Sequence, residues 1–471
     1  MSDSQPPIPG LSEKEIATEI AEAKHVYSSL TTEAKATHDL LNEQMKGEER
    51  SRSGYQYVAE PAPGYDVVGI WHTFPATTRS GYASHAVALH SMLERMRIPT
   101  MLAPHPTMEL DTEKFPPDRA AMLMRWHKDV VGVPKAFIGS FPPDHRSLDI
   151  GIGVPAYIPY VAFEALPMSE YAKRVCSSPL FKQIWCVSDF TKRCYLESGV
   201  PESKLAVVRP AICDGIWAGI SDHAPSSASS FVFGVNGTWH ERKGFHNLIR
   251  AYFSSFSRED DVTLAIRTSY FGSGRDKPLL MDFERQVLGE IGKIKLDYQK
   301  PGWKMPNIQL LTGTSLTDAE LLDWIGGLDC YVNPSFGEGL GIPPIHAAAQ
   351  GVPIVTSDFG AVGDFTRDCA GAADQSQAFR VFPSKLVPVP RDMLKHSALL
   401  DTKSCWGGYE VGDLADQMHA AFAAGRIRTP GTASLARARF SFDATCGALA
   451  SALEAVVDEE TLKTWGVWRG R

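Results

Sequence analysis

The clearest structural pattern in the sequence is Asn333-Pro334-Ser335-Phe336-Gly337-Glu338-Gly339-Leu340-Gly341-Ile342-Pro343-Pro344-Ile345-His346-Ala347. An apolar strand ends at Asn333, and a glycine-rich loop leads into a helix whose first turn suits Pro343-Pro344. We predict this helix from Ile345 to Gln350, with Gly351 directly after its end. Such a strand–loop–helix unit belongs to a parallel α/β sheet, and its loop can hold an anion on backbone N–H groups. Taken alone, the turn is equally consistent with a purely structural role.

A second glycine-bounded turn supports the ligand interpretation. Gly237-Thr238-Trp239-His240-Glu241-Arg242-Lys243-Gly244 directly follows a strand predicted over Phe231–Gly237. Lys243 would begin the next helix, where its ammonium group could neutralise a diphosphate. The alternative is a solvated helix start made of charged side chains. A position after the first strand of a doubly wound domain favours the ligand.

For the chain as a whole we predict two α/β domains with extensions. Strands alternate with helices from Asp66 onward, which predicts parallel sheets. We expect two facing Rossmann-like doubly wound domains, with ligands bound outside the carboxyl ends of the strands in the cleft between them. The predicted parts are a helical and partly disordered extension (1–60), an N-terminal domain (61–222), a C-terminal domain (229–445), and a C-terminal helix packing back on the N-terminal domain (446–471).

Composition narrows the possible functions. A chain of 471 residues is too long for one core, and its net charge of −8 disfavours duplex nucleic acid as the main partner. The eight cysteines are scattered, which favours buried thiols over disulfides or zinc and suggests the cytoplasm. No apolar run is long enough to span a membrane. The acidic cluster Glu259-Asp260-Asp261 is expected to be a solvated turn before a strand and not a metal-binding D-x-D motif.

Several blocks taken together resemble a known family. Pro334 to Pro353 closely matches the signature P-S-x-x-E-G-x-G-x-P-x-x-E-A-x-A-x-G-x-P of glycosyltransferase family 4. Residues from about 66 to 450 resemble a GT-B glycosyltransferase, with further blocks in the family's order. These blocks are Ser80-Gly81-Tyr82, Phe163-Glu164, Val187 to Lys192, Gly199-Val200, Lys204-Leu205, Asp318 to Leu322 and Thr356-Ser357-Asp358.

The resemblance implies a retaining, metal-independent transfer of a sugar from a nucleotide-sugar donor, a UDP- or GDP-sugar, without a further cofactor. Glu338 would contact the transferred sugar and Lys243 would stabilise the leaving group. The remaining donor-side residues implied by the resemblance or by their position are Gly81, Thr238, Arg242, Thr312, Gly313, Leu316, Gly339, Leu340, Gly341, Ile342 and His346.

Two positions depart from the family pattern. The second glutamate of the signature, which holds the nucleotide ribose in the family, is His346 here, and a neutral imidazole lacks the bidentate carboxylate grip. The arginine that normally accompanies the phosphate-binding lysine is Thr238. Arg242 and Arg267 are the candidates to replace it. Both departures leave open a noncatalytic subunit that binds a nucleotide sugar or a protein partner.

The acceptor side is less defined. Glu164, His72 and His145 each follow a predicted strand of the first domain, where an acceptor or the sugar could be contacted. A structural cap for Glu164 and simple packing for the histidines are the alternatives. A GT-B sugar-nucleotide epimerase would also explain a cleft, but not the signature block. The acceptor itself is not identified, and the N-terminal helices could serve homo-oligomerisation or acceptor docking.

Overall fold

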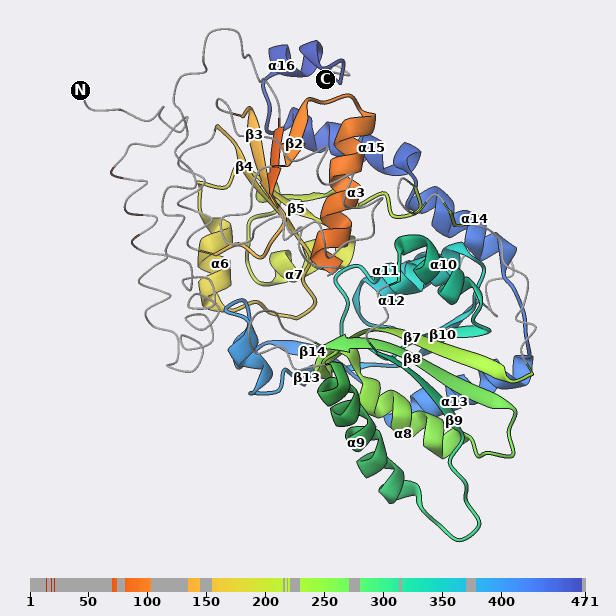
Figure 1. Cartoon of the computed structure of the whole chain (residues 1–471). Helices are drawn as coiled ribbons and strands as arrows, with labels where there is room; N and C mark the ends of the chain where they lie inside the picture. Colours follow the sequence, from red (N-terminus) through yellow and green to blue (C-terminus); the bar gives the residue numbers. More distant parts are fainter. Residues whose placement is uncertain are drawn as a thin grey trace. The chain divides into compact units, whose positions relative to one another are not determined.

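The computed structural model describes residues 14, 18, 21, 70–73, 81–102, 134–144, 155–214, 217, 219–220, 229–270, 280–312, 316–369 and 378–467. The chain divides into two compact units. The first comprises residues 1–211, 388–405 and 442–471, and the second residues 212–387 and 406–441. Each unit is built around its own parallel sheet (Figure 1).

The sheet of the second unit has the order β12-β11-β10-β7-β8-β9. Its strands are β7 (Phe231–Trp239), β8 (Val262–Tyr270), β9 (Asn307–Thr312), β10 (Cys330–Asn333), β11 (Ile354–Ser357) and β12 (Phe379–Phe382). All neighbours pair in parallel, which gives the doubly wound order 3-2-1-4-5-6. The order reverses where β7 meets β10, with Phe233 opposite Cys330 and Gly234 opposite Tyr331.

Helices cover both faces of this sheet (Figure 1). Successive side chains of a strand point to opposite faces, and Phe231, Phe233 and Val235 of β7 all enter one hydrophobic core. The helices α8 (Phe245–Ser255), α9 (Leu280–Tyr298) and α13 (Val411–Ala424) lie over this face. The opposite face carries α10 (Asp318–Gly326), α11 (Ile342–Ala349) and α12 (Gly360–Cys369). The buried apolar area between these layers is the main stabilising contribution of the unit.

The sheet of the first unit has the order β2-β1-β3-β4-β5-β6, again with parallel pairing throughout. Its strands are β1 (Ile70–Thr73), β2 (Thr100–Leu102), β3 (Ala136–Gly139), β4 (Tyr157–Val161), β5 (Ile184–Cys186) and β6 (Leu205–Val207). Its helices include α3 (Gly81–Arg95), α6 (Glu170–Ser177) and α7 (Asp189–Glu197). The Ser169 hydroxyl accepts a hydrogen bond from the Ala172 N–H, and the Ser188 hydroxyl accepts one from the Thr191 N–H. These caps fix where α6 and α7 begin.

Two segments from late in the sequence belong to the first unit. Residues 388–405, which the sequence analysis assigned to the second domain, are held by backbone hydrogen bonds between Leu166 and Cys405 in both directions, at 3.0 and 2.7 Å. Helices α15 (Phe442–Glu454) and α16 (Glu459–Thr464) also join this unit. The guanidinium of Arg95 in α3 stacks over the Phe442 ring at 4.9 Å.

The strand predicted over Phe231–Gly237 extends to Trp239 as β7, and the strand predicted to end at Asn333 is β10, which ends there. The short strands β12, β13 (Lys385–Pro388) and β14 (Cys405–Gly408) were not predicted, because four residues at a sheet edge leave little periodic signal. Helix α11 begins at Ile342, three residues earlier than predicted, and Gly351 follows its end with a φ of 71° as expected. The predicted N-terminal helices lie outside the described residues, apart from three helical positions at 14, 18 and 21.

Within the described part of the chain, none of the helices combines the length and apolar character needed to cross a membrane.

We expect Gly244→Ala to destabilise the second unit by about 2 kcal/mol or more. Gly244 has a φ of 68°, and a Cβ there would lie 2.1 Å from the carbonyl oxygen of Pro334. Chemical unfolding followed by tryptophan fluorescence measures the change. The matched control is Gly412→Ala in α13, where a Cβ meets nothing within 4 Å. Equal unfolding midpoints for the two variants would contradict this packing argument.

Candidate active site

The topology of the second sheet brings the two predicted turns together. One turn follows β7 and contains the short 3₁₀ helix Glu241–Lys243, so Lys243 precedes α8 by one glycine rather than beginning it. The glycine-rich turn follows β10. Since β7 and β10 are neighbours at the point where the strand order reverses, the turns at their carboxyl ends meet. Nearly a hundred residues of chain separate them in sequence.

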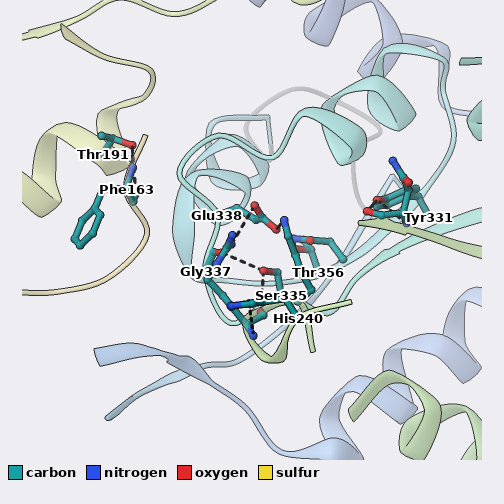
Figure 2. A network of polar contacts seen from close by, with 12 residues as sticks. Phe163, Thr191, His240, Tyr331, Ser335, Gly337, Glu338 and Thr356 are labelled. Carbon is teal, nitrogen blue, oxygen red and sulfur yellow. Dashed lines mark hydrogen bonds and ion pairs between the residues drawn. The ribbon is translucent and has the colours of Figure 1, made fainter. Parts of the chain in front are cut away.

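Hydrogen bonds hold the two turns against each other (Figure 2). The Phe336 N–H donates to the carbonyl of Arg242 at 2.8 Å, and the Ser335 hydroxyl lies within 3.1 Å of the Arg242 and Gly337 carbonyl oxygens. The Nδ1 of His240 accepts the N–H of Arg242 at 3.2 Å. The Tyr409 hydroxyl donates to the Pro334 carbonyl. The backbone of both turns is thus fixed before any ligand enters.

Glu338 is the centre of the cluster. Its Oε1 accepts a hydrogen bond from the Lys243 ammonium at 2.6 Å, and its Oε2 lies 3.5 Å from the guanidinium of Arg242. Arg242 also donates to the Gly337 carbonyl. The side chains of Glu338, Lys243 and Arg242 are 13%, 22% and 18% exposed, so the cluster is sheltered but open to solvent.

The charge state of Glu338 follows from these contacts. Burial opposes ionisation, but the Lys243 and Arg242 charges outweigh it and hold the pKa of the Glu338 carboxyl below its usual value of 4.5. The carboxylate is therefore ionised at neutral pH. It acts as the counter-ion of the two cations that the sequence analysis assigned to the phosphate side.

The glycine-rich turn is shaped by close approaches. Gly341, the N-cap of α11, has a φ of 81°, and a Cβ there would lie 2.3 Å from the Val362 methyl. Gly360 packs against the backbone of Glu338, whose carbonyl accepts the Ala361 N–H at 2.9 Å. Pro343 and Pro344 carry no N–H, so any anion at this helix start must use donors that precede them in the chain. The nearest such donors are the N–H groups of Gly339, Leu340, Gly341 and Ile342, the residues that the family resemblance implies.

His346 has a different environment from the one expected. Its ring is 1% exposed, and its Nε2 lies 2.8 Å from the carbonyl oxygen of Ile212, to which it donates. Trp217 covers it with a centroid distance of 5.7 Å. Burial lowers the pKa of His346 to about 4, so the ring is neutral. His346 thus links α11 to the Ile212 carbonyl, and its ring is almost completely buried.

Arg242 and Arg267, the two candidates to replace the family arginine, have different hydrogen-bond partners. Arg242 contacts Glu338, whereas Arg267 donates to the side-chain oxygen of Asn236 at 2.8 Å. The backbone N–H of Asn236 in turn donates to the Tyr331 hydroxyl at 3.2 Å. Thr238 lies two residues beyond Asn236 on β7, opposite Ser269 of β8. Arg242 therefore shares Glu338 as a partner with Lys243.

The other predicted donor-side residues of the second unit lie at the end of β9 and just before or at the start of α10 and α11. Thr312 is the last residue of β9, and partly buried Leu316 immediately precedes the capping box that begins α10. Gly313 lies outside the described residues. Leu340 is buried and Ile342 is partly exposed.

His72 lies in β1 and Glu164 follows β4, and their environments differ. His72 is fully buried, and its Nε2 lies 2.7 Å from the hydroxyl of Ser140, the residue that follows β3. Burial, with smaller contributions from His90 and His85, lowers the pKa of His72 well below its usual value. Glu164 is partly buried beyond β4, and exposed Gly81 begins α3. His145 lies outside the described residues.

Sequence reasoning missed the residues that hold the turns in place. Ser335, His240 and Tyr409 received no role, although Ser335 belongs to the matched signature. The serine could have been found because it matches a specified position of that signature, whereas Tyr409 comes from a distant segment. Among the described residues, no group of three or more His, Cys, Asp or Glu side chains is arranged to hold a metal ion.

Part of the second unit matches a known protein family. Residues 230–379 match the model of the family Glycosyl transferases group 1, so this stretch contains both turns. A sequence search of curated proteins found no significant match.

Among solved structures, the chain is similar to Anabaena Alr3699/HepE in complex with UDP and glucose, with a TM-score of 0.53 and 13% identity over 82% of this chain and 99% of that one. The same protein in complex with UDP-glucose gives a TM-score of 0.52 at 13% identity, over 82% and 99% of the two chains. At this identity the likeness establishes the fold. The fold is the two-domain GT-B architecture of glycosyltransferases.

We expect Glu338→Gln to lower the free energy of unfolding by about 2 kcal/mol at neutral pH, because two sheltered cations lose their counter-ion. The folded pKa of Glu338 is depressed, so its stabilising contribution is complete above the unfolded value of 4.5. That contribution is lost as the pH falls through the lower folded pKa. The difference between wild type and variant should therefore shrink under acid conditions.

Urea unfolding at several pH values measures this effect. The matched control is Glu410→Gln, which breaks an exposed ion pair with Lys385 and should change stability less. A deficit for Glu338→Gln that persisted unchanged at low pH would argue against the ion-pair explanation.

A second expected outcome concerns His346→Glu, which restores the residue of the family signature. The new carboxylate would be buried against the Ile212 carbonyl without the N–H donor, at a cost of about 2 kcal/mol or more. His346→Gln keeps an N–H donor and should cost less. Thermal unfolding of the two variants tests this. If His346→Glu were as stable as wild type, the buried contact would not be essential to the packing of α11.

Proposed function

We propose that the protein is a glycosyltransferase that transfers a sugar from a nucleotide-sugar donor to an acceptor hydroxyl. The observation that carries the proposal is the contact of Glu338 with Lys243 and Arg242 at the start of α11. The match of residues 230–379 to Glycosyl transferases group 1 supports it, as does the likeness to a protein solved with UDP and glucose. The donor we favour is a UDP- or GDP-sugar.

The chemical roles follow from charge and position. Lys243 and Arg242 would neutralise the diphosphate as the bond from the anomeric carbon to its oxygen breaks. The N–H groups from Gly339 to Ile342 would hold phosphate oxygens at the start of α11. Glu338, released from the two cations by the incoming diphosphate, would accept hydrogen bonds from hydroxyls of the sugar.

The acceptor oxygen would form its bond to the anomeric carbon on the face from which the diphosphate departs. The acceptor proton would pass to the departing diphosphate oxygen, so configuration at the anomeric carbon is retained. This route depends on leaving-group stabilisation and positioning, and it requires neither a protein nucleophile nor a metal ion. Retention and metal independence are parts of the proposal.

Arg242 is proposed to take the place of the family arginine that is Thr238 here. Its guanidinium is next to Lys243 in the chain and shares Glu338 as a partner, whereas Arg267 is engaged with Asn236. The ribose contact made by the second glutamate in the family is not assigned to His346, whose donor is already used by Ile212.

A thermal-shift screen with nucleotides and nucleotide sugars tests donor binding. We expect one nucleotide sugar to raise the unfolding temperature of the wild type, because a ligand that binds only the folded state stabilises it. Lys243→Ala should lose most of this shift. Lys300→Ala, an exposed lysine of the same unit, should keep it and serves as the matched control.

A turnover measurement distinguishes an active enzyme from a noncatalytic binding subunit. With the stabilising donor, we expect wild-type protein to release the nucleoside diphosphate, with kcat at least about 100-fold lower for Lys243→Ala. Glu338→Ala should still bind the free nucleoside diphosphate but lose selectivity for the sugar. Donor binding without any turnover would favour a noncatalytic nucleotide-sugar-binding subunit. No shift with any nucleotide would contradict the donor site itself.

A further inference from the structure

Helix α9 carries an exposed apolar stripe that the candidate site does not use. Met281, Leu288 and Leu296 are 71%, 51% and 64% exposed, although large apolar side chains on a surface helix usually face the core. The helix already buries a complete apolar face through Phe283, Val287, Ile291 and Ile294. The exposed residues therefore form a second apolar surface on the other side of the helix.

The stripe has regular helical spacing. Met281, Arg285, Leu288, Gly292 and Leu296 follow one another at intervals of four, three, four and four residues, which places them along one line of an α-helix. Gly289 adjoins Leu288, and a Cβ at Gly289 or at Gly292 would meet nothing within 4 Å. The backbone of another helix can thus approach closely at these two positions. We call these six residues the α9 stripe.

We propose that the α9 stripe is a homodimer interface in which α9 pairs antiparallel with α9 of a second copy of this chain. With the two-fold axis between Leu288 and Gly289, Met281 lies opposite the partner's Leu296 and Arg285 opposite the partner's Gly292. The Leu288 side chains of the two copies meet at the axis, where the glycines leave room. Such a surface is self-complementary, as a two-fold interface requires.

The charges beside the stripe select the antiparallel arrangement. Asp282 and Lys293 flank it on one side, and Glu284 and Lys295 flank it on the other. In an antiparallel pair each flank meets the same flank of its partner, so Asp282 faces the partner's Lys293 and Glu284 faces the partner's Lys295. A parallel pair would set acidic residues against acidic ones and lysines against lysines. Asp282 also has an in-helix pair with Arg285, but both side chains are exposed.

The same charges argue against a lipid surface as the occupant. A helix that lies on an anionic membrane has a predominantly basic polar face, whereas this stripe is flanked by as many acidic residues as lysines, one of each on either side. Helix α9 is about 28 Å long at the α-helical rise, so this contact alone is smaller than a standard stable interface. We therefore expect a monomer–dimer equilibrium that depends on protein concentration.

Sedimentation velocity of the full chain over a range of concentrations tests the proposal. The wild type should dimerise reversibly, and Leu288→Glu should raise the dimer dissociation constant at least about tenfold, because the substitution acts twice in a two-fold interface. Leu386→Glu is the matched control, since Leu386 is 58% exposed but lies on β13. It should leave the dissociation constant unchanged.

A charge exchange tests the orientation. Lys295→Glu places two acidic residues face to face in each half of the interface and should weaken the dimer about tenfold. Adding Glu284→Lys in the same chain restores opposite charges and should return the dissociation constant to near the wild-type value. A structural defect at Lys295 would not be repaired by a second substitution eleven residues away.

A cysteine crosslink tests the position of the axis. Leu288→Cys should form a disulfide-linked dimer on mild oxidation, whereas Gln286→Cys, exposed on the same helix but away from the stripe, should not. A monomer at all concentrations would overturn the proposal. A dimer insensitive to the α9 variants would also overturn it, and would point to another face. So would a monomer that sediments with anionic lipid vesicles through the stripe.

Discussion

The parallel pairing of β7 with β10 is the constraint on which the candidate site depends. These two strands are far apart in the chain, yet they are neighbours where the strand order of the second sheet reverses. The pairing places the Lys243 turn and the Glu338 turn at one sheet edge, and hydrogen bonds from Ser335 and Phe336 then fix the turns to each other. Without this neighbour relation the two motifs would be unrelated loops.

Much of this arrangement could be predicted from the sequence. The alternation of strands and helices gave the parallel sheets, because buried parallel strands and amphipathic helices leave distinct periodic patterns. The glycine-rich turn and Lys243 were identified from residue type and position, and Glu338 from the match to the family signature. Their predicted roles as sugar and phosphate contacts stay predictions, while their proximity is now a property of the structure.

The parts that could not be predicted depend on partners from distant segments. Arg242 and Arg267 were equivalent candidates in the sequence, and only the fold distinguishes the contact with Glu338 from the contact with Asn236. His346 was expected near a ribose, but its Nε2 is used by the Ile212 carbonyl. Likewise, the hydrogen bonds between Leu166 and Cys405 explain why residues 388–405 belong to the first unit, a relation with no local signal.

The Glu338 carboxylate gives the cationic turn an electrostatic property of its own. An anion that enters it does not meet two free positive charges, since it must exchange with a carboxylate already bound to them. The net Coulomb energy is then the difference between two attractions: that of the two cations for the entering anion, and that of the same cations for the Glu338 carboxylate. Simple anions such as chloride or sulfate gain little from this exchange, whereas a ligand that offers the displaced carboxylate new hydrogen-bond donors gains more. A turn of this kind would discriminate by what accompanies the negative charge as well as by the charge itself.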